Sequence, residues 1–215
     1  MTGGVGRLGE AITARLRGDG WSVLAAGRAD GDVSVPEEAR TLVERAVQEL
    51  GGLDLLVNGA GEGFAPKPFE QLDEDDWDAA FGATAKGSFF VTQAAAPHLR
   101  ASRGCVVMIE DVAGYQPWPS FAAHSAAKAA QAMLTRVLAR ALAPEVRVCG
   151  VAPGPVAVAR DQEERRAGET LLGRIGTADD VADAVAYLAG AGFVTGTTLF
   201  VDGGRSLKSG FSSEP

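Results

Sequence analysis

The sequence has few of the residues that build metal centres and disulfide frameworks. It contains only two cysteines and two histidines among 215 residues. Cys105 and Cys149 each lie in an apolar run that is typical of an interior strand. We therefore expect two buried free thiols, rather than a disulfide or a pair of metal ligands, and the sequence predicts no metal site.

The chain also lacks a long hydrophobic run and an excess of basic charge. No apolar stretch approaches the roughly 20 residues that a membrane-spanning helix needs. The glycine-rich first residues do not resemble a signal peptide. The formal net charge of −8 disfavours nucleic acid as a partner, because phosphate binding needs a basic face. These absences predict a cytoplasmic protein with neither a membrane nor a nucleic acid partner.

Glycine, by contrast, is abundant, with 28 residues spread along the chain as expected of many strand-to-helix turns. Short β-branched runs alternate with amphipathic stretches, which predicts an α/β fold with a doubly wound, Rossmann-like parallel sheet flanked by helices. We expect one domain over residues 1–215, with a loosely held tail at 206–215. The expected strands are 22–26, 53–58, 105–109, 147–151 and 198–201.

Side chains that can cap a helix mark the expected helix starts. The starts are Ser34 with Glu37 for a helix reaching Leu50, Asp73 for a helix running to Leu99, and Thr177 with Asp180 for a helix over 178–188. A further helix over 120–143 should stop before Pro144, because a proline ring disfavours helical geometry in the preceding residue.

A glycine-rich turn opens the chain at residues 2–9, which read Thr-Gly-Gly-Val-Gly-Arg-Leu-Gly, and leads into an apolar-striped helix. Such a turn lets backbone amides approach a pyrophosphate while the helix N-terminus adds partial positive charge. The turn therefore predicts a dinucleotide site.

Three later motifs follow this turn in a fixed order: Asn58-Gly59-Ala60-Gly61, Pro153-Gly154-Pro155-Val156 and 201–204, which read Val-Asp-Gly-Gly. With them, the sequence resembles short-chain dehydrogenases/reductases along nearly its whole length. The resemblance implies a dinucleotide cofactor. The contacts that it implies are Thr2, Gly3, Arg7, Leu8, Gly9, Asn58, Ala60, Gly61, Lys128, Pro153, Gly154 and Val156.

Arg7 replaces the family's middle glycine, a departure that resembles pteridine reductases and dihydromonapterin reductases and implies NADP(H). Arg7 and Arg28 can both pair with a 2′-phosphate through charge-assisted hydrogen bonds. Asp32 and Val33 resemble the family's adenine contacts. The stretch between Arg28 and Asp32 is too short for the usual helix and strand, so we expect an abbreviated adenine pocket.

The central strand that normally precedes the dinucleotide turn is missing, since only Met1 precedes Thr2. We expect a first strand truncated by a misassigned start, because a sheet without its middle strand leaves backbone groups unpaired. Mass spectrometry showing a native N-terminus at Met1 or Thr2 would contradict this expectation.

The family's catalytic positions are partly substituted. It uses a tyrosine proton donor, a lysine four residues later and a serine thirteen residues earlier, and these positions hold His124, Lys128 and Asp111. Asp111 again resembles pteridine reductases, whereas His124 is not the usual donor. An imidazole can transfer protons near neutral pH, and Asp111 favours its charged form while Lys128 opposes it. Thr84 occupies the place of the asparagine that holds the family's relay water.

Three functions are compatible with these residues. The first is an NADPH-dependent oxidoreductase that transfers a hydride to a C=O or C=N group of a small, planar substrate. The second is a non-redox isomerase, cyclase or dehydratase that uses His124 and Asp111 as an acid/base pair. The third is a redox-silent binding subunit. All three imply a homodimer or homotetramer, because helices 77–99 and 121–143 form the family's interfaces.

Two segments near the expected site have open roles. The charged stretch between Val156 and Arg174 is either a mobile substrate lid or a solvated helix. Tyr115, Trp118 and Phe121 either line a pocket for a planar substrate or anchor a loop.

Overall fold

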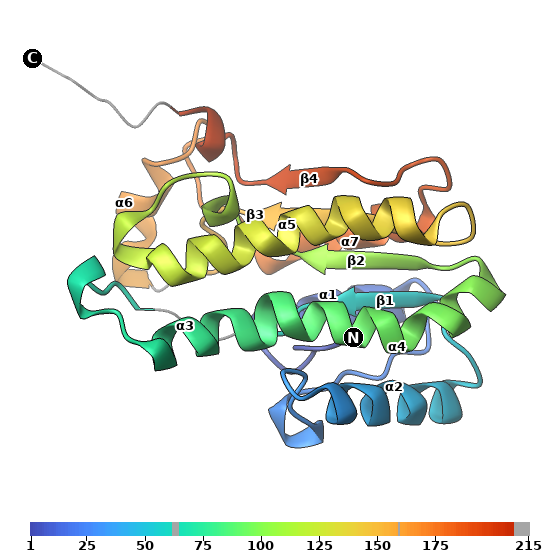
Figure 1. The fold of residues 1–215 in the computed structure, drawn as a ribbon. Helices are drawn as coiled ribbons and strands as arrows, with labels where there is room; N and C mark the ends of the chain where they lie inside the picture. The colour runs from blue at the N-terminus through green and yellow to red at the C-terminus, as the bar shows by residue number, and fades with distance from the viewer. Residues whose placement is uncertain (62–64, 159, 209–215) are drawn as a thin grey trace, which may run out of the picture.

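Four parallel strands form the centre of the computed structural model, which describes residues 1–61, 65–158 and 160–208. The strands lie in the order β1-β2-β3-β4 and all run in the same direction (Figure 1). Their bounds are β1 Leu55–Asn58, β2 Cys105–Ile109, β3 Arg147–Pro153 and β4 Thr198–Val201. The parallel α/β sheet predicted from the alternating pattern is confirmed.

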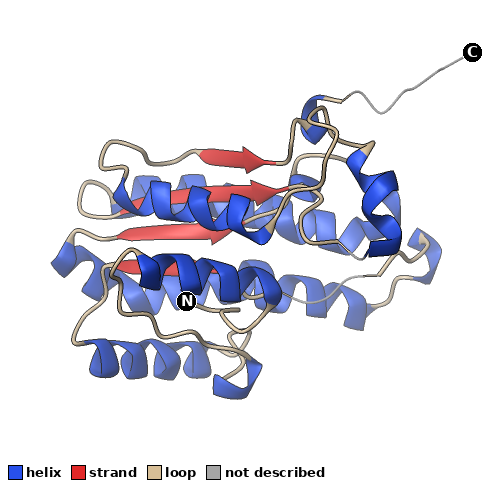
Figure 2. Ribbon diagram, turned by 180° about the vertical axis from the view of Figure 1, so that it is seen from behind, coloured by secondary structure: helices blue, strands red, loops and turns tan. Residues whose placement is uncertain are grey.

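Helices cover both faces of this sheet because successive side chains of each strand point to opposite faces. Val106 and Met108 pack under α2, α4 and α5, whereas Val107 and Ile109 pack against α1 and α7 (Figures 1 and 2). The bounds are α1 Arg7–Gly18, α2 Pro36–Leu50, α4 Gly87–Ser102, α5 Ala122–Leu142 and α7 Ala178–Gly190. Two shorter helices complete the set, α3 Glu74–Phe81 and α6 Glu163–Ala167. Both cysteines are buried and free, as expected.

Residues 22–26 do not form the predicted strand. Their contact with the sheet is an isolated bridge between Ala26 and Thr2, and Thr2 makes a second bridge towards β1. The Ala26 amide donates to the Met1 carbonyl at 2.9 Å, and the Thr2 amide donates to the Val57 carbonyl at 3.0 Å. Met1 and Thr2 alone thus lie between 22–26 and β1, which is too short a stretch for a continuous ladder on either side.

The capping predictions have mixed outcomes. The Asp73 side chain accepts from the Asp76 amide and caps α3, and Thr177 and Asp180 form the predicted capping box of α7. The prediction of a capping box at Ser34 is wrong, because the N-cap of α2 is Val35. The Ser34 amide instead donates to the Asp32 carboxylate at 2.9 Å, and α2 begins at a proline, whose fixed φ suits a first helical position.

The helix predicted from Asp73 to Leu99 is interrupted. A π-helical turn, Gly82–Lys86, separates α3 from α4. The helix predicted over 120–143 is α5, which begins at Ala122 after a 3₁₀ turn, Pro119–Phe121. Inserted π turns are frequent at functional sites because they re-aim side chains within a continuous helix.

The expected loose tail is described only in part. Residues 205–207 form a 3₁₀ turn, Arg205–Leu207, and residues 209–215 lie outside the described residues. Across the part of the chain that the structure describes, no helix combines the length and hydropathy needed to cross a bilayer.

Candidate active site

The glycine-rich turn is held by close approach of backbone to backbone. Gly3 has a φ of +66°, and a Cβ there would lie 2.3 Å from the Gly59 carbonyl oxygen. A Cβ on Gly9 would lie 2.1 Å from the Gly3 carbonyl oxygen. The Thr2 hydroxyl accepts from the Gly59 and Ala60 amides at 3.2 Å each. Only glycine permits this packing, which joins the turn to the loop after β1.

A cavity of about 370 Å³ opens beside this turn at the start of α1. The N-cap of α1 is Gly6, which has no side chain to cap the first turn, so the helix N-terminus faces the cavity with its own amides. These features fit a pyrophosphate. The predicted contacts that line the cavity are Thr2, Gly3, Arg7, Leu8, Gly9, Arg28, Asp32, Val33, Ala60 and Gly61.

Arg28 and Asp32 both line this cavity. Residues 28–30 form a 3₁₀ turn, Arg28–Asp30, in place of the helix and strand that family members usually have. Asp30 lies outside the cavity lining. It accepts from the Gly27 amide at 2.8 Å and from Arg45 at 2.9 Å, and these two bonds hold the pKa of its carboxyl below the usual value.

Two predicted cofactor contacts have partners within the protein. The Asn58 side chain is buried and donates to the Thr92 hydroxyl at 2.9 Å, and it does not line the cavity. The Arg7 guanidinium lines the cavity and donates to the Ala157 carbonyl at 2.8 Å. Arg7 therefore links the glycine-rich turn to the segment that follows β3.

A second cavity of about 420 Å³ adjoins the first and shares Arg7 and Leu8 with it. It contains further predicted residues, which come from the π turn between α3 and α4, from the carboxyl ends of β2 and β3, and from α5. These residues are Thr84, Asp111, His124, Lys128, Pro153, Gly154 and Val156. The positions that the family resemblance predicted, up to 72 residues apart from Thr84 to Val156, thus line one cavity.

Asp111 and His124 face each other in this cavity. One Asp111 oxygen accepts from the Ala113 amide at 2.7 Å and caps a 3₁₀ turn, Val112–Gly114, which fixes the carboxylate. The other oxygen lies 3.4 Å from the His124 Nε2. His124 is largely buried near the start of α5. The pair has the partners and the geometry of a proton donor with an orienting carboxylate.

Lys128 follows His124 by one helical turn of α5 and is buried. Its Nζ donates to the Ile109 carbonyl at 2.8 Å and to the Gln131 side chain at 3.0 Å. Burial lowers the pKa of Lys128 to about 8, while the negative charges of Asp111 and Glu110 act in the opposite direction. The lysine is thus held by two hydrogen bonds, and burial lowers its pKa from the usual value to about 8.

Thr84 lies in the π turn, is buried and lines the same cavity as His124. A Cβ added at Gly61 would lie 3.7 Å from the Thr84 hydroxyl oxygen, so the hydroxyl faces the loop after β1. The turn that interrupts the predicted helix therefore positions this residue.

Glu110 was not anticipated, although it is almost fully buried and lines the cavity. One of its oxygens accepts from Thr135 at 2.6 Å, and the other accepts from Tyr115 at 2.6 Å and from Thr198 at 3.0 Å. A charged residue directly after an apolar strand is the signal that could have found it. Tyr115 also packs against Phe200 at 4.7 Å, so it anchors the loop after β2.

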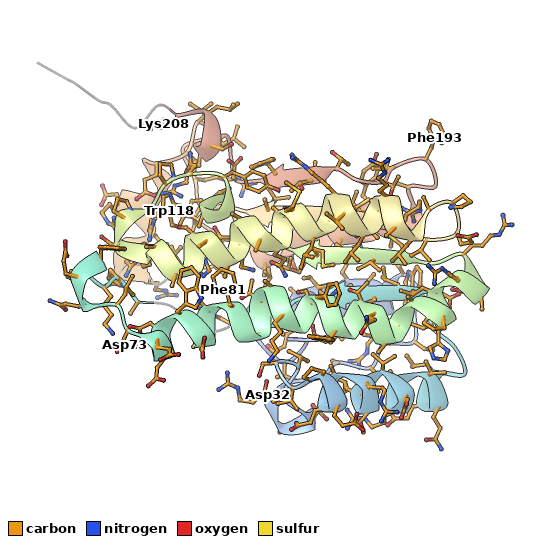
Figure 3. The ribbon with its side chains drawn as sticks, viewed as in Figure 1. Asp32, Asp73, Phe81, Trp118, Phe193 and Lys208 are labelled. Atoms are coloured by element: carbon orange, nitrogen blue, oxygen red, sulfur yellow. The ribbon has the colours of Figure 1, made fainter. Side chains whose placement is uncertain are left out.

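The other two aromatic residues lie at cavities. Trp118 lines the cavity that holds His124, on the loop before α5 (Figure 3). Phe121 lines a neighbouring cavity of about 310 Å³, and both this cavity and the one that Trp118 lines contain Thr84 and His124. No three histidine, cysteine, aspartate or glutamate side chains gather as a metal site within the described ranges.

Comparison with known proteins agrees with this architecture. A family model described as enoyl-(acyl carrier protein) reductase matches residues 8–206. The chain is 34% identical over 246 aligned positions to 3beta-hydroxysteroid dehydrogenase 1 of Eggerthella lenta, covering 98% of this chain and 94% of that protein. It is 35% identical over 243 positions to 4-formylbenzenesulfonate dehydrogenase TsaC1/TsaC2 of Comamonas testosteroni, covering 96% of each.

A solved structure gives the same result. A short-chain dehydrogenase/reductase from Brucella melitensis superposes with a TM-score of 0.88 at 29% identity, covering 95% of this chain and 94% of that one. The chain therefore belongs to the short-chain dehydrogenase/reductase family of oxidoreductases, which implies a nicotinamide cofactor, NAD or NADP.

Proposed function

We propose that this protein is an NADP(H)-dependent oxidoreductase that reduces a C=O or C=N group of a small, planar substrate. The observation that carries the proposal is the placement of Asp111, His124 and Lys128 in a cavity that adjoins the glycine-lined dinucleotide cavity. The relatives' names support carbonyl and alcohol chemistry, since one is a hydroxysteroid dehydrogenase and the other a formylbenzenesulfonate dehydrogenase.

The dinucleotide would lie across both cavities, and its nicotinamide supplies the hydride when bound. The first-turn amides of α1 would bind the pyrophosphate, and Asp32 and Val33 would contact the adenine. Ala60, Gly61, Pro153, Gly154 and Val156 would line the path to the nicotinamide end.

Preference for NADP(H) is supported by Arg28, which lines the dinucleotide cavity, because a guanidinium pairs well with a 2′-phosphate. Asp32 lines the same cavity, and its carboxylate interacts electrostatically with Arg28. Asp30 would repel this phosphate, but it is bonded to Gly27 and Arg45 outside the lining. Arg7 would add a second positive charge.

His124 would deliver the proton to the substrate oxygen or nitrogen. Asp111, 3.4 Å from Nε2, would orient the imidazole and stabilise its charged form. The Lys128 ammonium would bind ribose hydroxyls, and the Thr84 hydroxyl would hold a water that returns the proton. These roles use every substituted position of the family's catalytic set.

The test is NADPH oxidation with a panel of aromatic aldehydes, ketones and pteridines, monitored by absorbance. We expect turnover with NADPH that exceeds turnover with NADH. His124→Ala should lower kcat by about 100-fold, the lower end of what a positioned general acid contributes. Absence of NADPH binding by calorimetry would overturn the proposal.

A second candidate is a non-redox isomerase, cyclase or dehydratase on the same scaffold. The observation in its favour is the His124 and Asp111 pair, which is also the arrangement of an acid/base couple. Substrate conversion that needs His124 but consumes no NADPH would select this candidate.

We further propose that the protein acts in the cytoplasm as a homodimer or homotetramer. Trp77 on α3 and Met133 and Val137 on α5 are large apolar side chains that are 49%, 53% and 51% exposed in the single chain. Such side chains on adjacent helices are typical of an interface between copies.

A further inference from the structure

Two arginines that the reaction does not use line the catalytic cavity. Arg166 comes from α6 and Arg205 from the turn after β4, and both lie on the same cavity as His124. Their side chains are only 25% and 17% exposed. In Figure 1, α6 lies at the end of the sheet to which the strand arrowheads point, where parallel α/β folds bind ligands. The segment expected as a lid thus contributes a partly buried cation.

The arginines share a single carboxylate. Arg166 Nη1 and Arg205 Nε each lie 3.1 Å from the same oxygen of Glu169. The Nε of Arg166 is buried and makes no hydrogen bond within the described residues. Two cations on one anion leave a net positive charge and an unused donor, and a buried unpaired donor of this kind is costly.

The carboxylates in the cavity lining have other partners. Both oxygens of Glu110 accept hydroxyl groups, and Asp111 faces His124. The cavity therefore has negative charge where the proton is transferred and unbalanced positive charge at Arg166 and Arg205. A substrate that carries an anion would balance it.

The arginine site includes an aromatic ring, which favours an aromatic substrate. The Arg205 guanidinium lies 4.4 Å from the centroid of the Trp118 ring, which holds it as a planar donor in the cavity wall. Trp118 itself lines the cavity and offers an apolar surface to an aromatic ring.

From these observations we infer that Arg166 and Arg205 bind a carboxylate carried by an aromatic carbonyl substrate. The inference rests on the proposed function and names its substrate class: an aryl aldehyde or ketone with an anionic group on the ring. The carboxylate binds the guanidinium groups and the carbonyl lies towards His124.

The first experiment compares two substrates that differ in charge. NADPH oxidation is measured with 4-formylbenzoate and with the neutral 4-formylbenzamide. We expect kcat/KM to be at least 10-fold higher for the acid. Arg205→Gln and Arg166→Gln should each lower kcat/KM for the acid by about 10- to 100-fold, as expected for lost charge-assisted hydrogen bonds, and change the value for the amide less than twofold.

The matched control is Arg165→Gln. Arg165 is the neighbour of Arg166 on α6 and also contacts Glu169, but it is 65% exposed and does not line the cavity. This variant should retain the wild-type preference for the acid. Arg205→Lys, which keeps the charge, should retain part of the preference and shows that loss in Arg205→Gln is not misfolding. Equal losses for acid and amide would overturn the inference.

A second experiment separates this inference from the proposed function. Binding of 4-hydroxymethylbenzoate is measured by calorimetry without cofactor, against 4-hydroxymethylbenzamide. Binding of the acid that is lost in Arg205→Gln but kept in Arg165→Gln supports the arginine site, even if no carbonyl is reduced. Reduction of both aldehydes at equal rates, with no effect of the arginine variants, leaves the function standing and overturns the inference.

Discussion

In the proposed mechanism the chemistry depends on the imidazole of His124. Its Nε2 lies 3.4 Å from Asp111 and it precedes Lys128 by one turn of α5. The family resemblance predicts that it replaces the phenol of the usual tyrosine, and an imidazole is the shorter side chain. A shorter donor changes the distance over which the proton must move, and the rate of proton transfer depends on that distance.

His124→Tyr should therefore raise kcat for carbonyl reduction, by about 10-fold or more, because the phenol reaches further into the cavity. The measurement is NADPH oxidation under saturating substrate. The control is His98→Tyr, which should leave kcat unchanged. His98 is the other histidine of the chain and lies on α4. A fall in kcat for His124→Tyr would instead favour the non-redox candidate, in which the imidazole is the acid/base group.

Lys128 should make activity fall as the pH rises through about 8. Burial lowers the pKa of this ammonium to about 8, so it is charged below that pH and neutral above it. Only the charged form has a third N–H to donate to ribose beside its bonds to Ile109 and Gln131. The check is the NADPH dissociation constant between pH 6.5 and 9.5. Lys128→Met should bind weakly throughout and show no step near pH 8.

The same shift affects stability with a defined sign. An unfolded lysine titrates near pH 10.4, so between about pH 8 and 10 the unfolded chain binds one more proton at this position than the folded chain. The contribution of Lys128 to the free energy of unfolding therefore rises with pH over that window. The measurement is urea unfolding of wild type and Lys128→Met. The difference in the free energy of unfolding between the two proteins should change from pH 8 to pH 10 and be constant below pH 7.

Arg28 decides the nicotinamide cofactor in our proposal. Arg28→Ala should raise KM for NADPH by about 10- to 100-fold, because a hydrogen bond to a charged group contributes about 1.5–3 kcal/mol. KM for NADH should change less than twofold. Arg17→Ala, on the exposed side of α1, is the control. A similar rise for both cofactors would place Arg28 outside the 2′-phosphate site.

At the scale of elements, the helix starts show which of the predicted N-caps form in the structure. Asp73 and Thr177 cap α3 and α7 because their oxygens reach amides three residues away, within one turn. Ser34 has the same spacing from Glu37, yet its amide is bonded to Asp32 and α2 starts two residues later. The hydrogen bond from the Ser34 amide to Asp32 therefore replaces the bond to Glu37 that a capping box needs.

The capping box of α7 gives a stability prediction. Asp180 is bonded to Arg174 and to the Thr177 amide, which hold the pKa of its carboxyl well below the usual value. Thr177→Ala should lower the free energy of unfolding by about 1 kcal/mol, the usual contribution of an N-cap. Urea denaturation checks this, with Thr41→Ala on the exposed side of α2 as a control that should change stability less. Equal effects of the two variants would contradict the capping role.

The π turn between α3 and α4 is an element that helical periodicity did not predict. Helical spacing continues through the segment, so the apolar pattern alone predicts one helix over 73–99. The structure inserts Gly82–Lys86 and thereby places the buried Thr84 at the active-site cavity. An inserted residue in a helix depends on what packs against it, which local sequence does not encode.

At the scale of the whole molecule, the exposed apolar face of α5 concerns assembly. Met133 and Val137 lie one turn apart and are about half exposed in the single chain. Met133→Lys combined with Val137→Lys should shift the protein to a lower mass, because buried unpaired ammonium groups are costly at an interface. Light scattering after size exclusion measures this. Val35→Lys, at an exposed apolar residue before α2, should not change the mass. A monomeric wild type would contradict the proposed oligomer.

The sequence by itself determined the parallel α/β sheet, the order of the four motifs and the meeting of Asp111, His124 and Lys128. The sheet follows from apolar periodicity, which is a local property of a chain, whereas the motif order and the grouping of Asp111, His124 and Lys128 are predictions of the resemblance to short-chain dehydrogenases/reductases. The tertiary structure decided that Thr2 makes only isolated bridges, that Arg7 reaches Ala157, and that Arg166, Glu169 and Arg205 converge beside Trp118. Each of these contacts depends on how segments far apart in the chain pack together, and hydrophobic pattern alone carries no information about such pairs.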